Sequence, residues 1–452
     1  MAVQGTARRA FADAFAGEVI LPEDPTYEAA RAVWNGMIDR RPAMIVRPTG
    51  AADVITAVRF ARAEELPIAV RSGGHSIPGF STCDEGIVID LSRMRGVRVD
   101  PERRVARVSG GSLLGDLDHE AQAFGLVCPV GVISHTGAAG LTLGGGMGRL
   151  QRKLGLTIDN LLSADVVAAD GSLVHASEDA NPDLLWGLRG AGANFGIATS
   201  LEYRLHPLDH VVTHGSVLHP VDRASELAAL FRDSAENGPD ELWLSFGLGV
   251  DVARGPVAYV GALHSGSLAD ADRDLAKLRA FGPPAAGSID PKPYLTTQTM
   301  NDEAMRWGHR FYMKSAFLAD LADQVVERLV THLSRLPEGA DGEFSAWTMG
   351  RAVAAVPEDA TAYTGREAAF WLAAEILWDD ESLDSSCREW VRAALADVQP
   401  FAVTGRYVND VADAGDDVVR FVYGDAKYEK LVDLKRAWDP DNVFRLNQNI
   451  RP

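Results

Sequence analysis

The sequence has few cysteines and no long apolar run. Its three cysteines, Cys83, Cys128 and Cys387, are an odd number at wide spacing, which argues against a disulfide framework and against a zinc site. No segment is an uninterrupted membrane span, and the opening stretch MAVQGTARRAFADAFAGEVIL lacks the continuous apolar core of a signal peptide. A reducing, cytoplasmic location without a membrane partner is therefore expected.

Positive charge is also scarce. The chain has 44 lysines and arginines against 63 aspartates and glutamates, which gives a formal net charge of -19 at pH 7. No basic cluster interrupts this excess, and such a surface repels nucleic acid and anionic membranes. Neither nucleic acid nor a membrane is therefore expected as a partner, and the oligomeric state is not indicated.

The common metal and nucleotide motifs are missing. His206, His210 and His214 recur every four residues, but Pro207 and the pair Val211-Val212 interrupt a helical face. We interpret these histidines as solvated and expect no metal site. No glycine tract ends in Gly-Lys followed by Ser or Thr, and none has the strand, G-x-G-x-x-G and helix of the two-layer dinucleotide fold, so both motifs are excluded.

What is present is the composition of an ordinary globular protein, with 452 residues, 46% hydrophobic and 24% charged. This length predicts two or three domains. Short β-branched strands with occasional helices predict an α+β domain over residues 1–206, and a second α+β domain, richer in tryptophan, follows over 207–409. Residues 410–452 are a separate segment, whose polar end is expected to return to the first domain.

Local patterns predict individual elements. Apolar spacing and capping residues predict helices over residues 25–36, 51–63, 318–336 and 427–438. The dipeptide Asp170-Gly171 predicts the turn of a hairpin. The tryptophans are interpreted as core residues.

The stretch RSGGHSIPGFS, residues 71–81, follows a short β-branched run and is the most informative part of the chain. Gly73 and Gly74 let backbone amides approach a ligand closely, and Arg71 and the serines add donors for a phosphate. His75 is a potential nucleophile directly behind these glycines. The alternative is a glycine-rich surface loop with a solvated histidine, because short glycine motifs have many false positives.

Two further glycine-rich tracts lie in the same predicted domain, around Gly144 and Gly192. Together with the loop at Gly73 they present many backbone amides to one ligand. Such an arrangement indicates an extended anionic cofactor, and a dinucleotide with its pyrophosphate is one.

Five motifs, in order along the chain, carry a family resemblance. They are RSGGHS, SHTG-AAG-LTLGGGMG, GLTIDN, W-x-x-RGAGANFG and the closing WDPDNVFRLNQNI. Together they resemble the FAD-linked oxidases of the vanillyl-alcohol oxidase and p-cresol methylhydroxylase superfamily, most closely the berberine-bridge-enzyme-like branch with its bacterial hydroxynicotine oxidases. The resemblance covers the first 206 residues and the closing segment, and it is weaker between them.

This resemblance implies a two-part FAD-binding domain of the p-cresol methylhydroxylase type, made from both chain ends, and an α+β substrate domain with an antiparallel sheet and helices. It implies FAD as the cofactor, bonded through its 8α-methyl carbon to His75. The cofactor-binding residues that it implies are Arg71, Ser72, Gly73, Gly74, His75, Ser76, Gly79, Pro129, Ser134, His135, Thr136, Gly137, Gly140, Leu141, Gly144, Gly145, Asn160, Gly196, Ile197, Asn447 and Asn449.

Some members of this family have a second bond, from a cysteine to flavin C6. That cysteine lies a fixed distance before the GGG run, and here the position is Ile133, five residues after Cys128. A single covalent bond is therefore expected, with Cys128 as a partly buried free thiol. The backbone of the loop at His135 is expected to contact the flavin, and His135 is not expected to be a catalytic base.

The function implied by the resemblance is that of an FAD-dependent oxidase. It would take hydride from a C–OH or C–NH centre of a small or polycyclic organic substrate to flavin N5, with molecular oxygen as acceptor, in secondary metabolism. A flavin dehydrogenase with another acceptor and a redox-silent flavin-binding protein are the alternatives.

Loss of the substrate's heteroatom proton requires a base from the substrate domain or the tail. We expect Tyr407 and Asn409 to lie on one strand where the tail returns to the flavin, and we take them as the catalytic pair. The other candidates, each with a structural role as its alternative, are Tyr312, Glu343, Glu375, Tyr423 and Tyr428.

Overall fold

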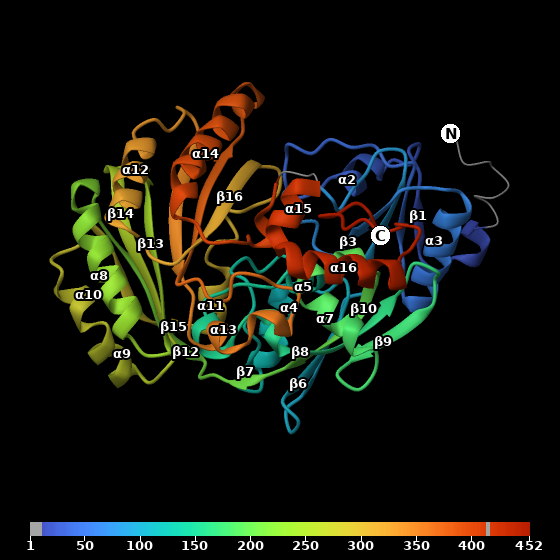
Figure 1. Cartoon of the computed structure of the whole chain (residues 1–452), viewed down its shortest axis with the longest axis horizontal. Helices are drawn as coiled ribbons and strands as arrows, with labels where there is room; N and C mark the ends of the chain where they lie inside the picture. The colour runs from blue at the N-terminus through green and yellow to red at the C-terminus, as the bar shows by residue number, and fades with distance from the viewer. Residues whose placement is uncertain (1–10, 413–415) are drawn as a thin grey trace.

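The computed structural model describes residues 11–412 and 416–452 and contains two lobes (Figure 1). Segments from both ends of the chain lie in one lobe, and the middle of the chain forms the other. No helix of the described residues is long and apolar enough to cross a membrane.

The first lobe opens with a four-stranded sheet in the order β1-β2-β4-β3. β2, β3 and β4 are parallel, and β1 pairs antiparallel with β2. The strands are β1 (Glu18–Ile20), β2 (Met44–Arg47), β3 (Ile68–Arg71) and β4 (Ile87–Asp90). The RSGGHS loop therefore begins at the carboxyl end of a parallel strand, the edge at which open α/β sheets bind ligands.

The helices of this sheet only partly follow the predictions. α3 (Ala51–Ala63) is confirmed, whereas the helix predicted over 25–36 is reduced to α2 (Tyr27–Arg31). Beyond α2 the backbone amides bond to other segments, because Trp34 N donates to Gly74 O and Gly36 N donates to His309 O. These contacts turn the chain toward the RSGGHS loop instead of continuing the helix.

A second, antiparallel sheet of the first lobe has the order β5-β6-β10-β8-β9. The predicted hairpin is confirmed, because β8 pairs with β9 and Gly171 takes the left-handed conformation in its turn, with a φ of 77°. The strands are β5 (Val97–Asp100), β6 (Val105–Ser109), β8 (Leu161–Val167), β9 (Leu173–Ser177) and β10 (Ile197–Arg204). The helices are α4 (Leu114–Gln122), α5 (Ala138–Leu143), α6 (Gln151–Leu154) and α7 (Pro182–Ala191).

The second lobe is a seven-stranded antiparallel sheet in the order β15-β12-β14-β13-β17-β18-β16. A small ladder of β7 (Leu126–Val127) and β11 (His206–Pro207) precedes it. The strands are β12 (Val211–Pro220), β13 (Leu242–Asp251), β14 (Gly255–His264), β15 (Ala286–Pro293), β16 (Arg310–Leu318), β17 (Asp341–Thr348) and β18 (Phe370–Trp378).

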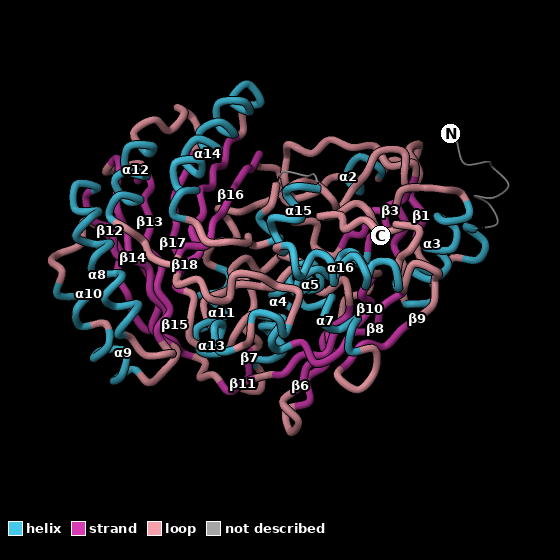
Figure 2. Tube along the Cα trace, viewed as in Figure 1, coloured by secondary structure: helices cyan, strands magenta, loops and turns pink. Residues whose placement is uncertain are grey.

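Helices cover the face of this sheet that points away from the first lobe (Figure 2). These are α8 (Ala224–Asn237), α12 (Asp323–Leu333) and α14 (Asp384–Val398), and their apolar sides share one core with the sheet. The shorter helices are α9 (Leu268–Asp274), α10 (Ala276–Ala280), α11 (Tyr294–Thr299) and α13 (Ala352–Ala355). The opposite face of the sheet is left free to meet the first lobe.

The helix predicted over 318–336 begins later than expected. Leu318 is the last residue of β16, where it pairs with Phe370 of β18, and α12 starts at Asp323. An apolar residue such as Leu318 is compatible with a strand or with a helix. Here the pairing of β16 with β18 places it in the strand.

The tail returns to the first lobe through α15 (Asp416–Tyr423) and α16 (Asp425–Trp438). An ion pair without solvent exposure, Lys435 to Asp439 at 2.7 Å, fixes the end of α16. Lys435 also donates to the carbonyl oxygens of Asn194 and Phe444. Lys435, held by Asp439 of the WDPDN motif, therefore ties the tail to the glycine-rich segment that precedes β10.

Candidate functional site

A cavity of about 620 Å³ takes its lining from both lobes. This volume lies in the range of roughly 300–1,000 Å³ that is typical of small-molecule sites. The predicted site residues that line it are Ser72, Gly73, Gly74, His75, Ser76, Thr136, Gly137, Gly140, Leu141, Gly144, Gly196, Ile197, Tyr407, Asn409 and Asn447.

Two glycine-rich loops meet in backbone contact at the wall of this cavity. A Cβ atom on Gly73 would lie 2.1 Å from the amide nitrogen of Gly137, and a Cβ atom on Gly137 would lie 2.2 Å from the nitrogen of Gly73. A side chain at either position would push the loops apart. Gly74, the next residue, has a φ of 74°. Its backbone conformation therefore also requires glycine.

His75 is held among aromatic rings where these loops meet. Its imidazole stacks on Trp34, with ring centroids 4.8 Å apart, and its Nε2 atom lies 2.7 Å from Nδ1 of His135. Burial, and to a lesser degree the neighbouring His135, lower the pKa of His75 to about 3. The imidazole is therefore neutral at physiological pH, and the alternative of a solvated histidine is wrong.

The closing NQN segment reaches the same cavity. The side-chain amide of Asn447 donates to the carbonyl oxygens of Ala193 and Phe444. Its Oδ1 atom, like Oγ of Ser81 in the RSGGHS loop, is buried without a hydrogen-bond partner among the described residues. Because buried polar atoms are normally satisfied, two lining residues are left with capacity for a polar ligand.

Other predicted cofactor residues lie outside the lining: Arg71, Gly79, Pro129, Ser134, His135, Gly145, Asn160 and Asn449. Arg71 donates to the carbonyl oxygens of Ala30 and Ser81, so its guanidinium holds the loop from behind instead of facing the cavity. The Asn160 amide similarly donates to the Leu156 carbonyl.

Tyr407 and Asn409 contact each other, but not on the predicted strand. Val408–Asp410 is a turn of 3-10 helix, so the strand prediction is wrong. The turn lets the Asn409 amide donate to the Tyr407 hydroxyl at 2.8 Å, and Gly146 N donates to the same oxygen at 3.1 Å. Burial raises the pKa of Tyr407, so the phenol keeps its proton. The hydroxyl can therefore donate a hydrogen bond to a third partner.

Two of the carboxyl groups that line the cavity from the second lobe form a pair. Glu343 of β17 and Glu375 of β18 are direct cross-strand partners, and the Tyr259 hydroxyl donates to Glu343 at 3.3 Å. Burial raises the pKa of both carboxyl groups, and the neighbouring Glu343 raises the pKa of Glu375 further. The pair therefore shares protons and titrates as one unit.

Asp410 lies in the same lining and is a third buried acid. Burial raises its pKa to about 7, although Trp371 Nε1 donates to it at 2.8 Å. Trp371 and Trp347 line the cavity beside it, with ring centroids 4.9 Å apart. The substrate-side wall thus combines aromatic surface with acids of raised pKa.

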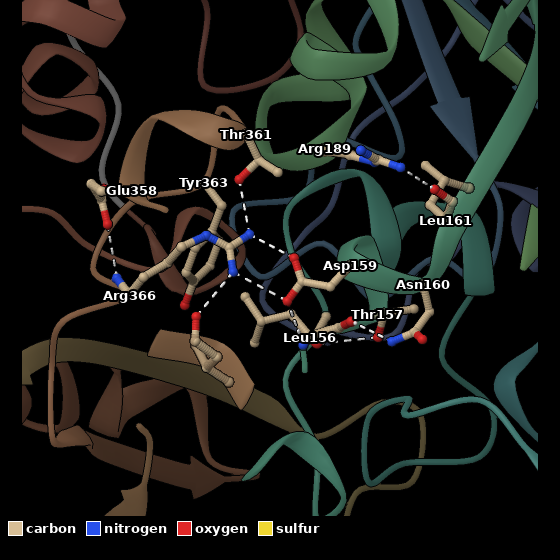
Figure 3. A network of polar contacts seen from close by, with 12 residues as sticks. Leu156, Thr157, Asp159, Asn160, Leu161, Arg189, Glu358, Thr361, Tyr363 and Arg366 are labelled. Atoms are coloured by element: carbon tan, nitrogen blue, oxygen red, sulfur yellow. Dashed lines mark hydrogen bonds and ion pairs between the residues drawn. The ribbon is translucent and has the colours of Figure 1, made fainter. Parts of the chain in front are cut away.

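A buried ion pair joins the two lobes close to this wall (Figure 3). Arg366 contacts Asp159 of the GLTIDN motif through two nitrogens, at 2.7 and 3.1 Å. The side chains are only 1% and 9% exposed. The Arg366 guanidinium also lies over the ring of Tyr363, and Tyr363 packs against Gly145 next to Tyr407.

Comparison with known proteins identifies this architecture. A model described as FAD binding domain matches residues 42–177, and one described as Berberine and berberine like matches residues 406–451. The (R)-6-hydroxynicotine oxidase of Paenarthrobacter nicotinovorans is 34% identical over 453 residues, which cover 96% of this chain and 97% of that protein. The chain belongs to the berberine-bridge-enzyme-like FAD-linked oxidases.

Two further proteins that are similar to this FAD-linked oxidase support the same family assignment. An FAD-linked oxidoreductase of Dictyostelium discoideum is 31% identical and covers 93% of this chain and 91% of its own length. The crystal structure of 6-hydroxy-D-nicotine oxidase from Arthrobacter nicotinovorans has a TM-score of 0.90 at 32% identity and covers 97% of this chain and 98% of that chain. The predicted α+β fold with a p-cresol-methylhydroxylase-type FAD-binding domain is confirmed, as is the FAD-dependent oxidoreductase activity.

The cavity of the oxidase suits FAD chemically. Gly73, Gly137 and Gly144 in its wall leave no room for a side chain, and the unpartnered oxygens of Ser81 and Asn447 can bind polar groups of a dinucleotide. A glucooligosaccharide oxidase from Acremonium strictum, described as carrying 6-S-cysteinyl, 8α-N1-histidyl FAD, shares the fold at 24% identity, with a TM-score of 0.89 and coverage of 99% of both chains. That protein shows that this fold can carry a doubly bonded flavin.

Cys128 and His214 differ from their predicted environments, whereas His210 is exposed as predicted. Cys128 is completely buried instead of partly buried, and burial raises the pKa of its thiol. His214 is only 4% exposed, so its interpretation as solvated is wrong; β12, which carries it, is an inner strand between β14 and β15. No group of three or more potential ligands within the described residues is arranged to hold a metal ion.

Some functional neighbours were missed by sequence reasoning. Trp307 was interpreted as core, yet it is 44% exposed and meets the His75 ring edge-on. Tyr363 and Asp410 had no motif of their own. Asp159 belongs to a recognised motif, but its partner Arg366 is 207 residues away, and no local pattern signals that contact.

Proposed function

We propose that this oxidase holds FAD along the main cavity, with the pyrophosphate at the glycine-rich loops and the flavin ring beside His75. The position of His75 carries the proposal, because it lies where two loops meet and has a neutral imidazole. A neutral imidazole is a nucleophile. We therefore assign the bond to the 8α-methyl carbon to His75.

We assign only one covalent bond. The Cys128 thiol is completely buried and its raised pKa keeps it protonated, which disfavours reaction. Ile133 lines the cavity at the position expected for a cysteinyl bond, and its side chain has no nucleophile.

Acid precipitation of the purified chain tests both assignments. Wild-type protein and Cys128→Ala should give yellow precipitates whose intact mass includes one flavin, whereas His75→Ala should release any bound flavin into the supernatant. A colourless wild-type precipitate would show that the covalent assignment is wrong, and a yellow precipitate from His75→Ala would show that a second anchor exists.

Bound FAD would accept hydride from the substrate carbon and pass the electrons to molecular oxygen. Two groups donate to the Tyr407 oxygen, so we propose that its own proton points to the substrate heteroatom and orients it. Because a phenol of raised pKa is a poor base near neutrality, we assign uptake of the heteroatom proton to the Glu343–Glu375 pair. This modifies the predicted role of Tyr407 and Asn409 from base to orientation.

The substrate-side wall favours a C–NH centre over a C–OH centre. A carboxyl pair that holds one proton keeps one negative charge, and the tryptophan faces attract cations. Both features stabilise the positive charge that develops on an amine nitrogen when hydride leaves the adjacent carbon. We therefore propose an aromatic or polycyclic amine as the substrate class.

Anaerobic mixing with a panel of aromatic amines and matched alcohols tests the substrate class. Bleaching of the visible flavin band by amines supports it, and bleaching by alcohols alone contradicts it. Absence of bleaching with every compound would favour a redox-silent flavin protein. Slow reoxidation of the reduced protein in aerated buffer would identify a dehydrogenase.

A further inference from the structure

We propose that His135 is a positioning residue for the covalent attachment of FAD: its Nδ1 atom holds the Nε2 proton of His75 and removes it while Nδ1 of His75 forms the new bond. The inference rests on the proposed function of His75. It assigns a role to the histidine of the SHTG motif, whose side chain does not line the main cavity.

The contact between the rings carries the proposal. His75 Nε2 and His135 Nδ1 are 2.7 Å apart, and the ring centroids are 4.7 Å apart. If Nε2 of His75 is the donor, its Nδ1 atom keeps a lone pair and can act as nucleophile. The reverse tautomer would put a proton on that atom and block the reaction, so the direction of this hydrogen bond decides reactivity.

Trp34 restricts the geometry of His75 further. Its ring stacks on the imidazole with an interplanar angle of 19°, and its own Nε1–H donates to the Met305 carbonyl at 2.7 Å. The stack limits rotation of the imidazole about its last side-chain bond. His75 can then present only one nitrogen to His135 and the other to the flavin.

His135 has a route for the proton on its far side. It lines a second cavity of about 260 Å³ together with Asp90, Ser92 and three arginines, Arg47, Arg71 and Arg95. Its Nε2 atom is buried and has no hydrogen-bond partner among the described residues. A proton accepted at Nδ1 can therefore be balanced by release from Nε2 toward this cavity.

The loop that carries His135 is fixed from both lobes. Ser134 N donates to Asp302 of the second lobe at 2.9 Å, and Gly115 N donates to the Ser134 carbonyl at 2.8 Å. His135 is thus held in place before the cofactor reacts, as a residue that orients another must be.

The overall reaction is balanced with molecular oxygen as oxidant. One C–H bond of the 8α-methyl group and the N–H bond of His75 are replaced by a C–N bond. The two electrons and two protons that are removed reduce one O2 to hydrogen peroxide. His135 takes the proton that leaves the imidazole.

The test follows covalent attachment in full-length protein that is expressed under riboflavin limitation and then incubated with FAD in aerated buffer. The readout is the fraction of chains whose intact mass includes flavin. We expect His135→Ala to bind FAD but to attach it at least tenfold more slowly than wild type. His119→Ala removes an exposed histidine of the same lobe and should match wild type.

Two further measurements separate proton transfer from mere packing. Added imidazole should accelerate attachment in His135→Ala and leave wild type unchanged. His135→Gln keeps a hydrogen-bond acceptor but not a base, so it should also be slow. Attachment at the wild-type rate in His135→Ala or His135→Gln, or absence of rescue by imidazole, would overturn the proposal.

These outcomes are distinct from failure of the proposed function. If wild-type protein carries no covalent flavin, the role of His75 is wrong. If wild type and His135→Ala attach flavin equally fast, only the role of His135 is wrong.

Discussion

At the residue scale, burial sets the charge of the groups around the cavity. It lowers the pKa of His75 and raises the pKa values of Glu343, Glu375 and Asp410. In each case the neutral form is favoured because the low-dielectric interior penalises charge. The site can therefore hold a neutral imidazole and a carboxyl pair that retains a proton at the same pH.

Glu375 should make the stability of the protein depend on pH. Its pKa is raised in the folded state above the ordinary value of 4.5, so its contribution is complete below that value and is lost as the pH rises through the raised pKa. The Tm of wild type should therefore fall more steeply over this range than the Tm of Glu375→Gln. Thermal unfolding at a series of pH values measures both slopes.

Other buried acids also make the Tm fall with rising pH, both in wild type and in Glu375→Gln. Asp118 and Asp410 have pKa values raised to about 7, so some decline remains in Glu375→Gln. Equal slopes for wild type and Glu375→Gln would contradict the assigned shift.

At the scale of elements, the glycine-rich loops form the cavity wall only because they pack against each other and against the tail. Gly144 shows this dependence, since a Cβ atom there would lie 2.1 Å from Oδ1 of Asn409. A motif around residue 144 and a turn around residue 409 thus form one unit. Their spacing in the sequence contains no sign of the contact.

Gly73→Ala should disrupt the contact between the first two loops. The new methyl group would meet the backbone of Gly137 at 2.1 Å, and such overpacking costs about 1–3 kcal/mol or more. Urea unfolding should show this loss, and purified protein should contain less flavin. Gly140→Ala is the matched control for unfolding, because nothing lies within 4 Å of its Cβ position. Equal stability of the two variants would contradict the packing account.

At the scale of the whole molecule, a buried charge pair connects two lobes whose sheets do not share strands. Arg366 contacts Asp159, Thr361 and the Val353 carbonyl, and this cluster lies next to the tyrosines of the cavity wall. Removing one charged side chain of the pair leaves the other charge buried and uncompensated. The closure of the lobes and the shape of the site are therefore coupled.

Arg366→Met should lower the free energy of unfolding by about 3–5 kcal/mol, the usual loss for a broken buried pair. Adding Asp159→Asn to it should cost much less than the two single changes together, because no uncompensated carboxylate remains. Asp441→Asn breaks the more exposed pair with Arg62 and should cost about 1 kcal/mol or less. Additive effects in the Arg366 and Asp159 double variant would show that the contact is not a cooperative pair. Urea unfolding of wild type, the two single variants, the double variant and Asp441→Asn measures these differences.

The sequence by itself determined the family, the FAD cofactor and the α+β class, because these depend on local motifs with fixed spacing. It also singled out His75, whose position after Gly73-Gly74 is a local property. Several elements were predictable for the same reason, including α3 and the β8–β9 hairpin.

Only the tertiary structure decided which polar groups meet and which are buried. It paired His75 with His135, Glu343 with Glu375, and Asp159 with Arg366. These contacts join distant parts of the chain, and the pKa shifts that give them chemical meaning come from desolvation after the strands pair and the lobes close. Periodicity and motif spacing describe neighbours along the chain, so they contain neither effect.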